Sequence, residues 1–444
     1  MKHAYGNAAI WSIALPMIIS TVSVPLLGLV DTAVLGHLDS PVYLAAVAVG
    51  ATVFNVAFMT LNFLRMGTTG IAAQAFGAGE PQPVLSSLVQ PLVIALLLAA
   101  VLLALQVPIL SLALLLLQPD SVVSPYVSEY FSIRIWSAPA MLCNLVMVGW
   151  LLGMQNARAT LAVYLLVNVS NMVLSVILVW GFGLDVRGVA TGTLVAEYAG
   201  TLLALWHVLR ELRLHGVDYS RQLSSTALTE VSRYMRLLRV NSSLFVRSLA
   251  LMFVFAFITA RGARLGADVL AINAVLLNFL YFFSYATDGL ANAAEALTGK
   301  AVGRQNREGL RLAVRNTLRW TAGFTVVFAL VYLLAGPVII DLLTGIDRVR
   351  SGAREYLPWI VALPLVSAWC FLYDGVYVGM TRTREMMLVM AGSVLGVFLP
   401  VWFVLQASGY GNHALWAALI AFMAVRSAGM HLWCRSLVDV VAKV

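Results

Sequence analysis

The stretch LVIALLLAAVLLALQVPILSLALLLL, residues 92–117, carries no charged side chain. It is longer than the roughly 20 apolar residues that a helix needs to cross a bilayer. Runs of this kind recur along all 444 residues, of which 61% are hydrophobic and only 11% are charged. A typical soluble chain carries about 25% charged residues. The sequence therefore predicts an all-α integral membrane protein with little chain left for a soluble domain.

Twelve apolar runs are predicted to be transmembrane helices. They lie at residues 9–36, 44–72, 88–116, 129–154, 160–181, 189–210, 238–260, 268–298, 314–343, 355–380, 387–407 and 413–435. The first run is longer than the apolar segment of a secretory signal, so we expect it to be retained as a span. The polar stretch 212–237 is interpreted as a cytoplasmic linker between an N-terminal lobe, 1–211, and a C-terminal lobe, 238–444.

The two lobes match each other when the sequence is shifted by 226 residues without gaps. The shift aligns Gly36 with Gly262, Gly77 with Gly303, Gly149 with Gly375, Gly153 with Gly379, Arg158 with Arg384 and Gly183 with Gly409. Such matches indicate a duplication into two parallel six-helix bundles. In transporters built from parallel repeats the substrate site lies between the halves. A duplicated channel or an inert scaffold is the alternative.

The net charge of +8 is explained by the predicted topology. With the N-terminus inside, the cytoplasmic segments hold most arginines and lysines, including groups within 213–239 and 300–311, and the outer loops hold fewer. This is the positive-inside pattern of membrane proteins. It predicts a multi-pass protein of the cell inner membrane with both termini cytoplasmic. The lipid bilayer, and not nucleic acid, is the expected partner of the basic residues.

Asp31 is the clearest functional candidate, because apolar residues flank it in the first span. An ionisable group inside the membrane marks a pathway or a coupling site by default. Burial disfavours the charged form of a carboxyl, so Asp31 could exchange a proton near neutral pH. Pro16 and Pro25 remove backbone donors from the same span and predict a kinked helix. Alternatively, Asp31 lies at the outer headgroups, since about 30 Å of helix separates it from Trp11.

Asn168, Asn171 and Ser175 are spaced by three and four residues in the fifth span. They therefore form one polar stripe that faces the interior of the bundle. The stripe could hydrogen-bond Asp31, or it could simply hold two helices together.

A second charged set marks a possible site in the C-terminal lobe. It consists of Arg247, Asp288, Glu295 and Asp374. Alternatively, Arg247 forms a static ion pair with one of the acids. Arg65 in the second span is expected to pair with an acid or to reach an interface.

No HExxH, GxSxG, P-loop or dinucleotide-binding motif occurs in the sequence. We therefore expect neither an enzyme nor a cofactor or metal site. The cysteines at 143, 370 and 434 fall inside predicted spans and are expected to be packing residues. Without a P-loop, an ion gradient is the favoured energy source for transport.

Two stretches resemble the DinF-type branch of the multidrug and toxin extrusion (MATE) family. They are VPLLGLVDTAVLGHL at residues 24–38 in the first span, and FLRMGTTG at 63–70 with QAFG at 74–77 in the second. The resemblance covers essentially the whole chain. It implies twelve helices in two lobes with an exporter's cavity between them.

The resemblance also implies roles for single residues. Asp31 matches the family's essential first-span aspartate, whose protonation is thought to couple proton entry to drug release. Pro16 matches the proline at which that span bends. Asn171 and Thr193 match an asparagine and a threonine of the same polar pocket.

Two departures from the family pattern bear on the coupling ion. Where related members carry a second aspartate, this chain has Ser175. Where the NorM-type branch has a glutamate on the seventh span, this chain has Arg247. The first departure removes a carboxylate from a sodium ligand set, and the second makes a cation site in the C-terminal lobe doubtful. Protons are therefore favoured over sodium.

These observations predict a secondary active multidrug exporter. It would be a monomeric, proton-coupled antiporter that moves amphipathic or cationic organic compounds by alternating access. A lipid-linked oligosaccharide flippase of the same superfamily is a second hypothesis, and it should line its cavity with several arginines to hold a pyrophosphate. Only Arg65 and Arg247 are evident inside the spans. A sodium-coupled exporter is a third hypothesis, and a membrane receptor or channel is a fourth.

Overall fold

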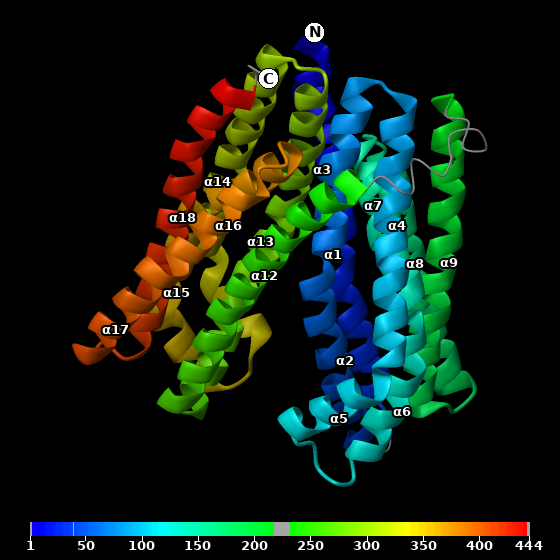
Figure 1. Ribbon diagram of the computed structural model, residues 1–444. Coiled ribbons are helices and arrows are strands. Elements are labelled where there is room, and N and C mark those ends of the chain that lie inside the picture. Colours follow the sequence, from blue (N-terminus) through cyan, green and yellow to red (C-terminus); the bar gives the residue numbers. More distant parts are fainter. Residues whose placement is uncertain (1, 39, 217–230, 442–444) are drawn as a thin grey trace. The chain divides into compact units, whose positions relative to one another are not determined.

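The computed structural model describes residues 2–38, 40–216 and 231–441. These residues are helical almost throughout, and twelve segments among them are long and apolar enough to cross a membrane (Figure 1). The predicted all-α fold with twelve spans is therefore confirmed. Of the predicted linker 212–237, residues 217–230 lie outside the described residues.

The helices of the first half cover the predicted spans, but the spans 44–72, 88–116 and 129–154 are each divided into shorter helices. They are η1 (Lys2–Tyr5), α1 (Asn7–Gly36), α2 (Pro41–Leu61), α3 (Phe63–Ala78), α4 (Pro81–Ala104), α5 (Gln106–Leu117), α6 (Ser124–Arg134), η2 (Ile135–Ser137), α7 (Ala138–Gly153), α8 (Ala157–Val176), the π-helical turn η3 (Ile177–Gly181) and α9 (Asp185–Leu214). The predicted span 88–116 is broken at Leu105 into α4 and the shorter α5. Pro108 explains the break, because it has no backbone N–H to bond the carbonyl four residues earlier.

The helices of the second half extend beyond the predicted spans. They are α12 (Val231–Leu265), α13 (Ala267–Gly303), α14 (Arg307–Leu343), α15 (Asp347–Gly379), α16 (Thr383–Ser393), the π-helical turn η4 (Val394–Phe398), α17 (Leu399–Ala407) and α18 (Asn412–Val441). The additional turns carry charged residues such as Lys300, Arg307 and Asp347. Hydropathy locates only the apolar part of a helix, so it misses these polar ends.

The described chain forms two compact units. The first unit comprises Ile19–Leu238, and the second unit combines Met1–Ile18 with Arg239–Val444. The first eighteen residues are grouped with the C-terminal half, and the first unit extends to Leu238. The predicted boundaries of the lobes, 1–211 and 238–444, stay predictions.

Polar and aromatic contacts hold the start of α1 on α14. The Asn316 amide donates to the backbone carbonyl of Tyr5 at 3.0 Å, and the Trp320 indole donates to the Asn7 side chain at 3.1 Å. The rings of Trp11 and Trp320 meet edge to face, with 4.9 Å between their centroids. Helix α1 therefore begins in one unit and ends in the other.

The duplication predicted from the sequence is visible in the backbone. Residues with left-handed backbone torsions recur at the same offset of 226 residues. The pairs are Gly79 and Gln305, Gln155 and Thr381, Gly183 and Gly409, and Asp185 and Gly411. Only one of these pairs consists of two glycines, so the halves share turn geometry even where the residues differ.

Matched glycines also set the approach of equivalent helices. A Cβ atom on Gly149 of α7 would lie 2.5 Å from the backbone oxygen of Arg65 on α3. A Cβ atom on Gly375 of α15 would collide with the backbone oxygen of Ala291 on α13. The two contacted residues are themselves 226 positions apart. Both halves thus use a glycine at the same point to bring two helix backbones together.

Candidate functional site

Helices α1, α8 and α9 bring together four of the five predicted polar residues of the first unit. The Ser175 hydroxyl donates to Oδ1 of Asn171 at 3.2 Å, and the Thr193 hydroxyl lies 3.4 Å from the same oxygen. The Ser175 hydroxyl also lies within hydrogen-bonding reach of the Asp31 carboxyl. Asp31 is half-buried and the other three are buried. We call these four side chains the Asp31 cluster.

Helix spacing and small residues build the Asp31 cluster. Asn171 and Ser175 lie one turn apart on α8, so they share one face of that helix. On α9, a Cβ atom on Gly192 would lie 3.1 Å from the backbone nitrogen of Ser175. The absence of a side chain there lets α9 pack closely on α8. Thr193, the next residue of α9, is thereby held beside Asn171.

Asn168 makes a different contact from the rest of the predicted stripe. Its amide donates to the Ser23 hydroxyl of α1 at 2.6 Å, and that hydroxyl donates to the backbone carbonyl of Ser20. One end of the stripe therefore joins α8 to α1, while the other end surrounds Asp31. Helix α1 continues past Pro16 and Pro25, and the kink at these prolines stays a prediction.

The Asp31 carboxyl is incompletely hydrogen-bonded. Its Oδ1 atom is buried and has no hydrogen-bond partner among the residues that the structure describes. Leaving a buried acceptor unsatisfied costs about 1–3 kcal/mol, so such atoms are rare in native proteins. A bound proton would remove the charge of the carboxyl and supply a donor. The geometry is therefore suited to a group that exchanges a proton.

Two charged residues near the Asp31 cluster were not identified from the sequence. Arg134 of α6 is only 6% exposed and lies near both Asp31 and Glu197 of α9. The Asn144 amide donates to Oε2 of Glu197 at 2.9 Å. The sequence did contain a signal, because both residues fall inside predicted spans, where any ionisable group is a functional candidate.

Asp31, Arg134 and Glu197 form a charged set of two acids and one base. Buried charges in proteins are normally compensated by opposite charges. With both acids ionised, the set has a formal charge of minus one. It becomes neutral when it holds a single additional proton.

The second unit contains a charged set with the opposite balance. Arg247 of α12 and Arg426 of α18 both donate to Oδ2 of Asp374 on α15. Arg426 is fully buried and Asp374 is 5% exposed. The predicted pairing of Arg247 with an acid thus has Asp374 as its partner. Arg426 was missed, although it lies inside the twelfth predicted span.

The remaining predicted residues lie elsewhere. Asp288 and Glu295 are on α13, where Asp288 is half-buried and Glu295 is buried close to Gly379 of α15. The Arg65 guanidinium donates to the Asn62 side chain at 3.2 Å, one turn earlier. In the described ranges, no group of three or more His, Cys, Asp or Glu side chains is placed to hold a metal ion.

Several known proteins are similar to this chain in sequence or in fold. The family model described as MatE matches residues 16–177 and again residues 244–404, once in each half. The DNA damage-inducible protein F of Escherichia coli strain K12 is 46% identical over 97% of this chain and 92% of its own length. A probable multidrug resistance protein NorM of Deinococcus radiodurans is 27% identical over 96% of the chain and 93% of its own. A solved structure of a MATE protein in the straight conformation matches with a TM-score of 0.89 at 20% identity, covering 100% of this chain and 99% of that one.

Proposed function

The chain belongs to the MATE family of membrane transporters, and from this premise we propose that it is a secondary active exporter that exchanges protons for amphipathic or cationic organic compounds. Family membership makes it a multi-pass membrane transporter and not an enzyme, as expected from the sequence. We assign it to the cell inner membrane, with both termini in the cytoplasm. It acts as a monomer, by alternating access between its N-terminal and C-terminal lobes.

The observation that carries the proposal is the Asp31 carboxyl, whose buried Oδ1 atom has no hydrogen-bond partner in the described part of the chain. We assign Asp31 as the proton acceptor. Asn168, Asn171, Ser175 and Thr193 shape its surroundings through neutral amide and hydroxyl groups. A proton needs only one carboxyl, and the Asp31 cluster holds only one. This composition supports protons over sodium as the coupling ion.

The buried arginines do not favour the flippase hypothesis. A pyrophosphate site needs guanidinium groups that are free to bind phosphate oxygens. Arg247 and Arg426 donate to Asp374, and Arg134 lies near two acids, Asp31 and Glu197. The positive charges of these arginines are therefore already compensated by acids within the protein.

The function is tested by reconstituting the full chain in proteoliposomes that contain a pH-sensitive dye. Adding a cationic dye substrate should drive protons in the opposite direction at the same rate in sodium-containing and sodium-free buffer. Substrate movement that requires sodium, and moves no protons, would instead establish a sodium-coupled exporter.

Glu197→Gln is expected to move the pH midpoint of transport to lower pH by about one unit. The amide removes one acid from the charged set, so that Arg134 alone then compensates Asp31 and the set is neutral without an extra proton. The measurement is the initial rate of substrate-driven proton flux as a function of pH.

The control for this shift is Glu129→Gln. Glu129 is also an acid of the first unit, but it pairs with Arg187 and its side chain is 28% exposed. The groups that face Glu197 from neighbouring helices are Arg134 of α6 and Tyr164 of α8. An unchanged midpoint in Glu197→Gln, or an equal shift in the control, would show that Glu197 does not share a proton with Asp31.

A further inference from the structure

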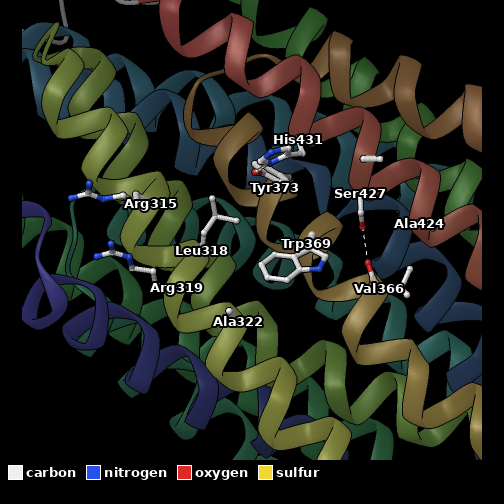
Figure 2. A pocket seen from close by; sticks show the side chains of 11 residues that line it. Arg315, Leu318, Arg319, Ala322, Val366, Trp369, Tyr373, Ala424, Ser427 and His431 are labelled. Carbon is white, nitrogen blue, oxygen red and sulfur yellow. Dashed lines mark hydrogen bonds between the residues drawn. The ribbon is translucent and has the colours of Figure 1, made fainter.

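A groove in the unit Met1–Ile18 with Arg239–Val444 has no role in the proposed transport mechanism. Helices α14 and α18 both pack against α15 and touch each other little. A cavity of about 670 Å³ therefore opens between them, with α15 as its floor. It is lined by residues from all three helices (Figure 2).

The groove is polar at one end and apolar at the other, as Figure 2 shows. At the polar end, Oη of Tyr373 and Nδ1 of His431 share a hydrogen bond. Arg315 and Arg319 project from α14, and Trp369 of α15 lies at about the level of Arg319 in this view. The apolar end is lined by Ala322, Val366 and Ala424.

The sequence of α14 places the polar end at the level of the lipid headgroups. After Arg319 the helix has no charged residue until Asp341, so residues 320–340 can cross a hydrocarbon core of about 30 Å. Trp320 begins this stretch, and tryptophan is enriched at the membrane interface. The lining residues of α14 cover about two turns, so the groove reaches about 10 Å from the headgroups toward the hydrocarbon.

Arg315 and Arg319 give the groove a positive charge. Both are exposed, and within the described ranges neither forms an ion pair. Figure 2 shows their guanidinium groups projecting from α14 away from Trp369, so the charges lie at the rim of the groove. No carboxylate is among the lining residues. The rim is therefore complementary to an anion.

A phospholipid has the same sequence of charge, polarity and apolar surface. Arginine binds phosphate through charge-assisted hydrogen bonds, and basic pockets between membrane helices bind anionic headgroups. If Tyr373 donates to Nδ1 of His431, Nε2 of that ring carries a hydrogen and can donate to a headgroup oxygen. We propose that the groove between α14, α15 and α18 binds one anionic phospholipid, with its phosphate at Arg315 and Arg319 and an acyl chain beside Trp369.

The lipid site is independent of the coupling ion. It requires only that the chain spans a membrane, which its family establishes. On the proposed topology, the bound lipid belongs to the cytoplasmic leaflet.

The first test is native mass spectrometry of the purified full chain with phosphatidylglycerol and phosphatidylcholine of identical acyl chains. The unmodified protein should retain one phosphatidylglycerol in preference to phosphatidylcholine. The double variant Arg315→Gln/Arg319→Gln should bind phosphatidylglycerol about tenfold more weakly. The matched control Arg239→Gln/Arg384→Gln removes two exposed charges outside the groove and should keep the preference.

Trp369 supplies a second readout that reports position. Phosphatidylglycerol with brominated acyl chains should quench the fluorescence of the unmodified protein more than that of Trp369→Phe, and brominated phosphatidylcholine should quench both equally. The additional quenching should vanish in Arg315→Gln/Arg319→Gln. Equal retention of both lipids by the unmodified protein would overturn the proposal. So would a preference that survives in Arg315→Gln/Arg319→Gln, or one lost equally in the control.

Discussion

Asp31→Asn is expected to reduce substrate-driven proton flux to the level of protein-free vesicles. The amide has nearly the same shape as the carboxyl and can still contact Ser175, but it cannot take up and release a proton. In the Asp31 cluster, no other side chain is a carboxyl, so nothing there can replace this function. The measurement is dye acidification or alkalinisation in proteoliposomes after addition of a cationic substrate.

Thr32→Val is the matched control for this loss. Thr32 is the next residue of α1, is exposed, and its hydroxyl donates to the backbone carbonyl of Gly28 in the same helix at 2.8 Å. The control should transport at the rate of the unmodified protein. Both variants should elute as monodisperse protein before they are compared. Full proton flux in Asp31→Asn would refute the proposed coupling mechanism.

Asp374→Asn is expected to destabilise the protein by about 3–5 kcal/mol. Asp374 is the common acceptor of Arg247 and Arg426. Without its charge, two guanidinium groups remain buried close together with no counter-charge. Thermal unfolding of the purified protein in detergent, followed by tryptophan fluorescence, measures the loss.

Two comparisons make this result specific. Arg247→Met leaves Asp374 paired with Arg426 and makes the set neutral, so it should destabilise much less than Asp374→Asn. Asp341→Asn removes the acid that pairs with Arg350 and Arg354 near the surface, and such pairs contribute at most about 1 kcal/mol each. If Arg247→Met were as destabilising as Asp374→Asn, a balance of charge would not explain the stability of this set.

The fold could be predicted because a membrane imposes one strong rule on sequence. Each span must be apolar for about 20 residues, and this pattern is local. The errors are also local in origin. Pro108 separates α5 from the third span, and charged turns extend α13, α14 and α15 beyond their apolar parts.

The candidate site could be predicted where a charge stands alone in an apolar span, as Asp31 does, or where polar residues share one helix face. The spacing of Asn171 and Ser175 predicted a common helix face. The charged partners of Arg134, Glu197 and Arg426, in contrast, lie on helices that are far away in the sequence. Each of these three residues was visible as a charge inside a predicted span. Which acid each arginine compensates depends on how the helices pack, and spacing along one helix carries no information about that.

The left-handed turns shared by the two halves allow positions in one half to be compared with positions in the other. These turns recur at an offset of 226 residues even where the residues differ. The positions of the second half that are equivalent to Asp31, Arg134 and Glu197 hold Phe257, Ile360 and Met423. The positions of the first half that are equivalent to Arg247, Asp374 and Arg426 hold Thr21, Val148 and Gly200. The turns are thus inherited in common, whereas the buried charges of the two halves have diverged since the duplication. The two halves therefore share one backbone scaffold but carry different buried charged residues.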